Sequence, residues 1–411
     1  MTATRWDLGC SLRSPRRPAC DQRISKSVPS YEDELAQIVA QLNRAAPTSR
    51  ALRPDAGPSS ATLDQLLVHA TRRGASDILL VVDAPVILRV NGSLTPVAGP
   101  VLSAESTRNL LLPLLTTSQY EELQRNKSVD LCFTHDGIGR FRGNVHHQRG
   151  TLAGSIRLLP EKIPTLESLH LPPTLKRLAE ARQGLILVTG PTGCGKSSTL
   201  AALLDLINTQ RRSHIVTIED PVEFVHANRN SIVEQIEVGH DTPDFASSVR
   251  SILRQTPDVI LVGEMRDPET MATVLTAAET GHLVLSTLHT NDTSQAISRI
   301  LDSFPAASQP QIRQQLSLAL LAIIAQQLVP GSGESGRYPA VEIMVATHAV
   351  RNLVRKGEDH QIYTAIGTGR SEGMITMEQS LAEMVRAGRI GRETALAHCF
   401  RSEDLRRYLQ E

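Results

Sequence analysis

The amino-acid sequence predicts an α/β protein in which a parallel sheet is preceded by a smaller α+β domain. The first observation is a series of short apolar runs between residues 184 and 288: GLILVT, SHIVTI, DVILVG and HLVLSTL. They lack polar alternation, as expected of strands covered on both faces, and stretches of helical length separate them. The second is the alternating, β-branched pattern between residues 76 and 160, which is typical of an α+β domain.

The length and composition fit a folded protein of two or three domains. Its 411 residues and 40% hydrophobic content allow each domain a core of its own. Lysine plus arginine equals aspartate plus glutamate, at 43 each, so no global positive field favours nucleic acid or an anionic membrane. Only six Phe, five Tyr and one Trp are present for base stacking, which disfavours a nucleic-acid translocase.

The cysteines and apolar runs indicate a protein of the cytoplasm. The five cysteines form no C-x-x-C pair, which argues against a zinc knuckle or a disulfide framework and favours a reducing compartment. The longest apolar run, residues 316–325, has about half of the ~20 residues that cross a bilayer, and we expect a buried helix there. No apolar region of signal-peptide length follows Arg5, so secretion is not expected.

The N-terminal part of the chain divides into two segments. Residues 1–58 are rich in Arg, Pro and Ser and are expected to be a disordered extension. A helical stripe within it fits either a helix docked on its own protein or one that binds a partner, and it consists of Leu35, Ile38, Val39 and Leu42. Residues 59–160 are expected to form the α+β domain.

The remainder of the chain is expected to be one α/β domain. Pro160 and Pro164 resist continuation of a helix or strand, so a hinge is expected between them. The α/β domain then covers residues 165–411. After Pro330 a Gly-rich turn leads into a mostly helical C-terminal region.

The segment GPTGCGKSS is a candidate phosphate-binding loop with the pattern G-x-x-x-x-G-K-S. Its glycines let backbone amides turn toward phosphates, Lys196 neutralises the β and γ oxygens, and the Ser197 hydroxyl ligates magnesium. A predicted strand precedes it and a predicted helix follows, which argues against a mere Gly-rich turn. The expected nucleotide contacts are Gly190, Pro191, Thr192, Gly193, Cys194, Gly195, Lys196, Ser197 and Ser198.

Polar clusters follow three other predicted strands. Parallel strands end at one edge of a sheet, so these clusters should converge on the phosphate loop. Glu264 can then orient or deprotonate the attacking water, and Gly263 before it leaves room. Acids such as Glu219 and Glu223 can contact magnesium through its waters. The members of the clusters are Glu219, Asp220, Glu223, Glu264 and His289.

Each of these residues also has a purely structural interpretation. A lone Glu after a strand often caps a helix, and a lone His is often a satisfied structural residue. Asp267 could pair with Arg266 or cap the next helix. The shared edge with a phosphate loop favours a functional role for Glu264, Glu223 and His289.

With four motifs in order, the chain resembles the secretion-superfamily ATPases, and within them the PilT-type retraction ATPases of type IV pili. The motifs are the phosphate loop, TIEDPVEFVH, ILRQTPDVILVGEMRD and AAETGHLVLSTLHTNDTSQAISRILDSFP, and the similarity runs from about residue 62 to 390. The resemblance implies a PAS-like N-terminal domain, a RecA-like P-loop ATPase domain, six chains in a ring, and ATP and Mg²⁺ as cofactors.

The resemblance also implies roles for individual residues. Glu264 would be the catalytic glutamate, Glu223 its acidic partner and His289 a sensor of nucleotide state, while Ser197 and Glu219 are the expected metal residues. Arg140 and Arg142 in RFRGN match arginines that reach a neighbouring subunit's phosphates. On sequence pattern alone these two arginines fit equally well on a solvated strand face.

The resemblance points to retraction. The segment AVRNLVRKG resembles the AIRNLIRE segment associated with retraction, and the four-cysteine zinc motif usual in extension ATPases is absent. This implies a motor on a pilus platform protein at the cytoplasmic face of the inner membrane, without a transmembrane segment. The alternatives are a pilus assembly or type II secretion ATPase, or a weakly hydrolysing nucleotide-binding ring. Two features depart from the family pattern: Leu79 stands where a histidine is usual, and residues 1–58 have no counterpart.

Overall fold

The computed structural model describes residues 62–90, 92–333 and 336–410. The expected extension of residues 1–58, with its helical stripe, lies outside the described residues. Among these residues no helix is both long enough and apolar enough to span a membrane.

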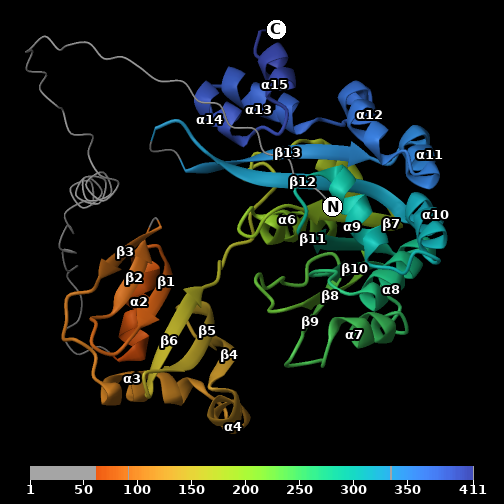
Figure 1. Ribbon diagram of the computed structural model, residues 1–411. Helices are drawn as coiled ribbons and strands as arrows, with labels where there is room; N and C mark the ends of the chain where they lie inside the picture. Colours follow the sequence, from red (N-terminus) through yellow and green to blue (C-terminus); the bar gives the residue numbers. More distant parts are fainter. Residues whose placement is uncertain (1–61, 91, 334–335, 411) are drawn as a thin grey trace, which may run out of the picture. The chain divides into compact units, whose positions relative to one another are not determined.

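The α+β part is a six-stranded antiparallel sheet in the order β3-β2-β1-β6-β5-β4, with three α-helices packed on it (Figure 1). Alternate residues of its strands face a core that includes Leu67, Ile78, Leu111 and Phe141. The elements are α2 (Leu63–Arg72), β1 (Ala75–Leu80), β2 (Ile87–Val90), β3 (Ser93–Pro96), α3 (Ala104–Leu111), η1 (Leu112–Leu114), α4 (Thr117–Asn126), β4 (Ser128–His135), β5 (Gly139–Gln148) and β6 (Thr151–Leu158).

The α/β part is built on a seven-stranded sheet in the order β13-β12-β7-β11-β10-β8-β9. All neighbouring pairs are parallel except β12 and β13, which form an antiparallel pair. The strands are β7 (Gly184–Thr189), β8 (His214–Glu219), β9 (Ile232–Glu237), β10 (Val259–Val262), β11 (Leu283–Leu288), β12 (Leu320–Pro330) and β13 (Arg337–Val345).

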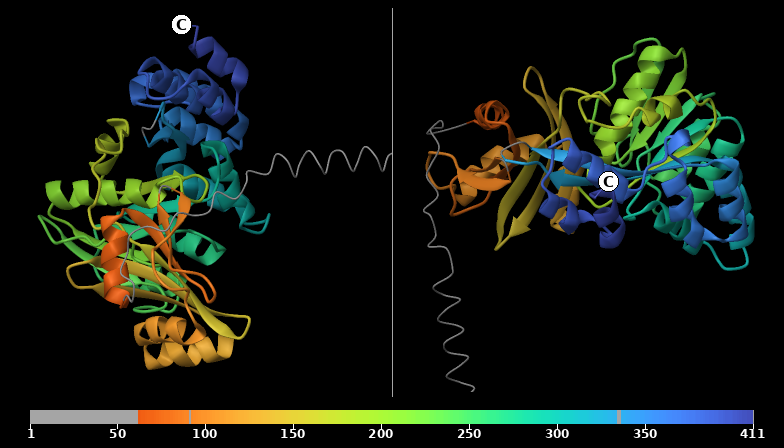
Figure 2. Two further views of the ribbon diagram at one scale, coloured as in Figure 1. Left: turned by 90° about the vertical axis from the view of Figure 1, so that its left-hand side faces the viewer. Right: turned by 90° about the horizontal axis from the view of Figure 1, so that it is seen from above.

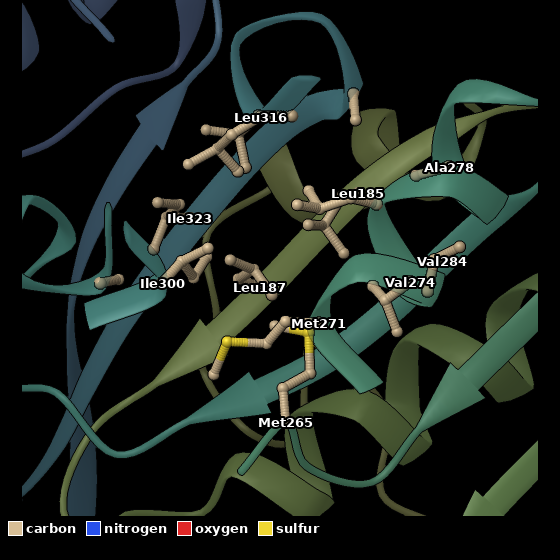
Figure 3. Packing of buried hydrophobic residues seen from close by; sticks show 14 of the residues in the cluster. Leu185, Leu187, Met265, Met271, Val274, Ala278, Val284, Ile300, Leu316 and Ile323 are labelled. Atoms are coloured by element: carbon tan, nitrogen blue, oxygen red, sulfur yellow. The ribbon is translucent and has the colours of Figure 1, made fainter. Parts of the chain in front are cut away.

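Helices cover both faces of this sheet. Along β7, Leu185 and Leu187 belong to one core and Ile186 and Val188 to the other, which explains why the strand lacks polar alternation. Figure 3 shows Leu185 and Leu187 among side chains of α8 and α10. The helices are α5 (Thr174–Ala179), α6 (Lys196–Gln210), α7 (Phe245–Ile252), α8 (Pro268–Glu279), α9 (Thr293–Asp302) and α10 (Gln309–Ala319).

The C-terminal region begins with strand β13 and then becomes helical. Helices α13 and α14 pack against the β12–β13 hairpin around a separate small core that includes Val329, Ala340 and Leu381 (Figures 1 and 2). The elements are α11 (His348–Lys356), η2 (Asp359–Gln361), α12 (Ile362–Thr368), η3 (Arg370–Glu372), α13 (Met377–Arg386), α14 (Arg392–His398) and α15 (Ser402–Tyr408).

The expectation of one buried helix over residues 316–325 is wrong. Helix α10 ends at Ala319, and strand β12 starts at the next residue. Because β12 lies between β7 and β13 with both faces covered, Ile323 packs into one core and Ile324 into the other. An apolar run of this kind cannot be told from a buried helix by its periodicity, and the β-branched isoleucines favour the strand.

Candidate active site

The candidate site lies at the carboxyl edge of the parallel strands. The phosphate loop leaves β7 and enters α6, and the neighbouring strands β11, β10 and β8 end beside it. A cleft of about 560 Å³ lies there, within the roughly 300–1,000 Å³ of small-molecule sites. The expected residues that line it are Thr192, Gly193, Gly195, Lys196, Ser197, Ser198, Glu219, Asp220, Glu223, Glu264, His289 and Arg142.

The other three expected loop residues do not line the cleft but support the shape of the loop, and they are Gly190, Pro191 and Cys194. Gly190 has φ +146°, and a Cβ there would lie only 2.2 Å from the Gln326 carbonyl oxygen, so no other residue fits. The carbonyls of Gly190 and Pro191 accept hydrogen bonds from the Lys196 ammonium. Cys194 is 2% exposed, and burial raises the pKa of its thiol, which keeps it neutral and unreactive.

Lys196 is the cation at the centre of the cleft. Its Nζ lies 2.9 Å from the Gly190 oxygen, 3.2 Å from the Pro191 oxygen and 3.5 Å from His289 Nδ1. Burial lowers the pKa of Lys196, and the nearby carboxylates of Glu264 and Glu223 oppose that shift. The ammonium is therefore held beside the loop by dipoles and negative charge.

His289 connects Lys196 to Glu264. An ammonium can only donate hydrogen bonds, so in this contact His289 Nδ1 is the acceptor, which matches the tautomer with its proton on Nε2. That Nε2 lies 3.5 Å from Glu264 Oε2. The same Glu264 oxygen pairs with Arg266 Nε at 2.8 Å, and the glutamate side chain is only 13% exposed. The three expected residues therefore form one polar chain across the ends of β7, β11 and β10.

The acidic residues sit at the end of β8. Glu219 Oε1 accepts hydrogen bonds from Thr217 Oγ1 at 2.7 Å and from Gln235 Nε2 at 3.2 Å, and burial raises the pKa of this carboxyl. Glu223 lines the cleft beyond it. At Gly263 a Cβ would lie 3.2 Å from the Ile218 carbonyl oxygen, so the glycine lets β10 pass close to β8 before the chain reaches Glu264.

The two arginines of β5 have different surroundings. Both project from the face opposite the buried Phe141, as their spacing predicts. Arg142 lines the cleft. Arg140 is not among the lining residues: its Nη2 pairs with Glu237 Oε2 at 2.6 Å and its Nη1 donates to the Val222 carbonyl at 2.7 Å.

Sequence reasoning missed three further arginines that line the cleft: Arg157, Arg266 and Arg337. Arg157 on β6 is the cross-strand partner of Arg142. Like charges directly opposite each other destabilise a sheet, and the Asp77 carboxylate on β1, which pairs with Arg157 Nε at 2.9 Å, offsets part of this repulsion. The sequence offered a signal for Arg157, because this arginine lies in the predicted strand that follows the one containing RFRGN. Of the two structural roles considered for Asp267, the structure shows helix capping, because its side chain accepts a hydrogen bond from the Thr270 amide at the start of α8.

Comparison with known proteins agrees with this architecture. The family model described as "Type II/IV secretion system protein" matches residues 53–397. The chain belongs to this family. Among the relatives of this secretion ATPase, the type IV pilus retraction ATPase PilT of Pseudomonas aeruginosa is 42% identical over 333 residues, which cover 81% of this chain and 96% of that protein. A twitching motility protein of Neisseria gonorrhoeae is 43% identical over 319 residues, 78% of this chain and 85% of that protein.

A solved structure of the family matches as well. The crystal structure of the pilus retraction motor PilT with bound ADP has a TM-score of 0.79 and 41% identity, covering 84% of this chain and 99% of that chain. The predicted resemblance to secretion ATPases, the α/β fold class and the assignment as an ATPase are therefore confirmed. The secretion ATPase described here is accordingly a nucleotide-binding protein.

Proposed function

We propose that this chain is an ATP-hydrolysing motor that powers retraction of type IV pili and twitching motility. We further propose a homo-hexamer that acts on a pilus platform protein at the cytoplasmic face of the inner membrane. One observation carries the proposal: Lys196, His289 and Glu264 converge in one cleft, in a chain similar to PilT over nearly all of that protein's length.

The phosphate loop and its lysine bind the nucleotide in this proposal. Backbone amides of the loop and the N-terminus of α6 attract phosphate oxygens, and Lys196 neutralises their charge. Arg142 and Arg157 add two guanidinium groups, which form paired hydrogen bonds to phosphate. The role predicted for Arg140 and Arg142 on the nucleotide of an adjacent chain stays a prediction, because within one chain Arg142 lines the cleft and Arg140 pairs with Glu237.

Glu264 is the proposed catalytic base. Its carboxylate lines the cleft and is mostly shielded from solvent, so it can orient the attacking water and accept its proton. His289 links this carboxylate to Lys196. When a phosphate takes up the Lys196 ammonium, His289 Nδ1 loses its donor, so the histidine is placed to report nucleotide state to Glu264.

The residues present fit Mg²⁺. No cluster of three His, Cys, Asp or Glu side chains able to hold a metal occurs in the described part of the chain, and Mg²⁺ does not need one, because it usually takes one or two protein oxygens with phosphates and water. Ser197, Glu219 and Glu223 line the same cleft. A cation there would also stabilise the ionised form of the buried Glu219. When bound, Mg²⁺ would neutralise charge on the phosphates.

A deletion strain tests the biological direction of the motor. We expect excess surface pili and loss of twitching, restored by the parent gene and not by Glu264→Gln. Bald cells would instead indicate an assembly ATPase, and normal pili with a secretion defect would indicate a type II secretion ATPase. Steady-state phosphate release from the purified protein separates these motors from a ring that binds nucleotide with little turnover.

A further inference from the structure

Gln326 is a buried polar residue directly behind the phosphate loop. Strand β12 pairs with β7 as far as Ala325 and Thr189, so the next residue on β12 stands beside the point where β7 becomes the loop. Gln326 is 3% exposed, although an amide is costly to bury without hydrogen bonds. Its position therefore calls for partners within the protein.

Both ends of the Gln326 amide are bonded to the phosphate-loop segment. Nε2 donates to the Cys194 carbonyl at 2.6 Å, and Oε1 accepts from Thr199 Oγ1 at 2.8 Å. Thr199 is fully buried and Cys194 nearly so, so none of these groups can turn to solvent instead. The two partners flank residues 195–198, which carry the lysine and the serine of the motif.

The glycines of the loop show how closely Gln326 is fitted. A Cβ at Gly190 would lie 2.2 Å from the Gln326 carbonyl oxygen, and a Cβ at Gly195 would lie 2.9 Å from Nε2 of its side chain. Gln326 thus leaves no room for a side chain at the first and sixth positions of the loop. Its amide also hydrogen-bonds to the Cys194 carbonyl, which lies between these two positions.

We propose that Gln326 is a positioning residue for nucleotide binding. Its amide ties the loop carbonyl at residue 194 to the first turn of α6 and holds residues 195–198 in the shape that receives phosphate. Gln326 does not line the cleft, so it acts through the loop rather than by touching the ligand. The inference rests on the proposed nucleotide site at residues 190–198.

Gln327 provides a matched control. It is the next residue on the same strand, and its Nε2 donates to the carbonyl of His398 at the end of α14 at 2.8 Å. It therefore makes a hydrogen bond of similar length to a backbone carbonyl, but in the C-terminal region and away from the loop. Gln326→Met and Gln327→Met remove the same chemical group while keeping a similar side-chain length.

The experiment measures the Kd for N-methylanthraniloyl-ADP by fluorescence, together with the Tm of each variant without nucleotide. For Gln326→Met we expect Kd to rise about tenfold, which corresponds to ~1.4 kcal/mol. Gln327→Met should stay within about twofold of the parent, because its hydrogen bond does not reach the loop. A lower Tm for Gln326→Met with parental Kd would show a purely structural role and overturn the proposal.

A second variant removes the same hydrogen bond from the opposite side. Thr199→Val keeps the shape of the side chain, should also weaken binding, and should add little in the Gln326→Met background, because the two residues share one bond. Fully additive effects of the two substitutions on Kd would contradict the proposal.

If Gln326→Met fails to fold, a parental Kd in Thr199→Val overturns the proposal. Lys196→Ala distinguishes the two assignments: unchanged Kd there would reject the nucleotide site itself, whereas weakened binding there with parental Kd in Gln326→Met would reject only the role of Gln326.

Discussion

At the scale of single residues, Glu264 allows nucleotide binding and hydrolysis to be tested separately. It lies 3.5 Å from His289 Nε2 and 2.8 Å from Arg266 Nε, so its carboxylate has an ordered environment that an amide of the same shape would largely keep. An amide cannot accept a proton from water. The difference between Glu and Gln at this position therefore isolates the proton-accepting role.

For Glu264→Gln we predict near-parental nucleotide affinity and a fall in turnover of at least about 100-fold, the lower end of what a general base contributes. Fluorescence binding and phosphate release on the same preparation measure the two quantities. Glu264→Asp is the control, because it keeps the charge and moves it away by one methylene. Turnover of the Gln variant within a few-fold of the parent would remove Glu264 from the mechanism.

At the scale of single elements, the sequence predicts the four adjacent strands β7, β11, β10 and β8, because stretches of helical length separate their short apolar runs. β7 and β10 are almost wholly apolar, whereas β8 and β11 also contain buried Thr217, Ser286 and Thr287, and polar residues of the site lie at or just after the strand ends. β9 was not predicted, because it is an edge strand with the polar sequence IVEQIE and no fully buried residue. Residues 320–325 of β12 are predicted as helix, so the sequence does not indicate that Gln326, the next residue, stands beside the end of β7.

The site was predictable where a contiguous motif or the rule that parallel strands end at one edge applies. The phosphate loop is contiguous, and the strand-end rule gathers Glu219, Glu264 and His289 at the same edge. The partners of Arg140 lie 82 and 97 residues away, on the acidic segment and β9, and no local pattern indicates them. The hydrogen bonds of Gln326 likewise depend on which strand lies beside β7.

Asp267 gives a prediction for helix α8. Its Oδ1 accepts from the Thr270 amide at 2.8 Å and its Oδ2 from the Thr270 hydroxyl at 2.6 Å, which satisfies a free N–H of the first turn. Asp267→Ala should lower stability by about 1 kcal/mol, and the Tm by about 2–4 °C, with kcat at 25 °C near the parent value. Asp267→Asn keeps the cap and should behave like the parent. An Asn variant as inactive as a catalytic mutant would show that the carboxylate has a role beyond capping.

At the scale of the whole molecule, several polar contacts join helix α6 to the segment between β8 and β9, among them the hydrogen bond from Asn208 Nδ2 to the Ala227 carbonyl and the Arg229–Asp205 ion pair. His226 lies in this segment. The His226 residue is 9% exposed, and its Nδ1 is buried without a hydrogen-bond partner among the described residues. Burial lowers the pKa of His226 from 6.5 to about 4; Asp205 on α6 opposes the shift and Arg229 adds to it. The folded protein thus keeps the ring neutral where the unfolded chain would protonate it.

The sign of the resulting pH dependence follows from proton uptake. Between pH 6.5 and 4 the unfolded chain binds a proton that the folded protein does not, so stability is complete above pH 6.5 and falls as the pH is lowered toward 4. At pH 5 the loss from this one group should be about 2 kcal/mol. His226→Gln cannot take up the proton, so between pH 7.5 and pH 5 its Tm should fall by about 4–8 °C less than that of the parent. Other titrating groups are common to both proteins and cancel in this comparison at equal protein concentration. Equal falls in Tm would mean that the His226 ring is protonated in the folded protein, with water or Asp205 as its partner.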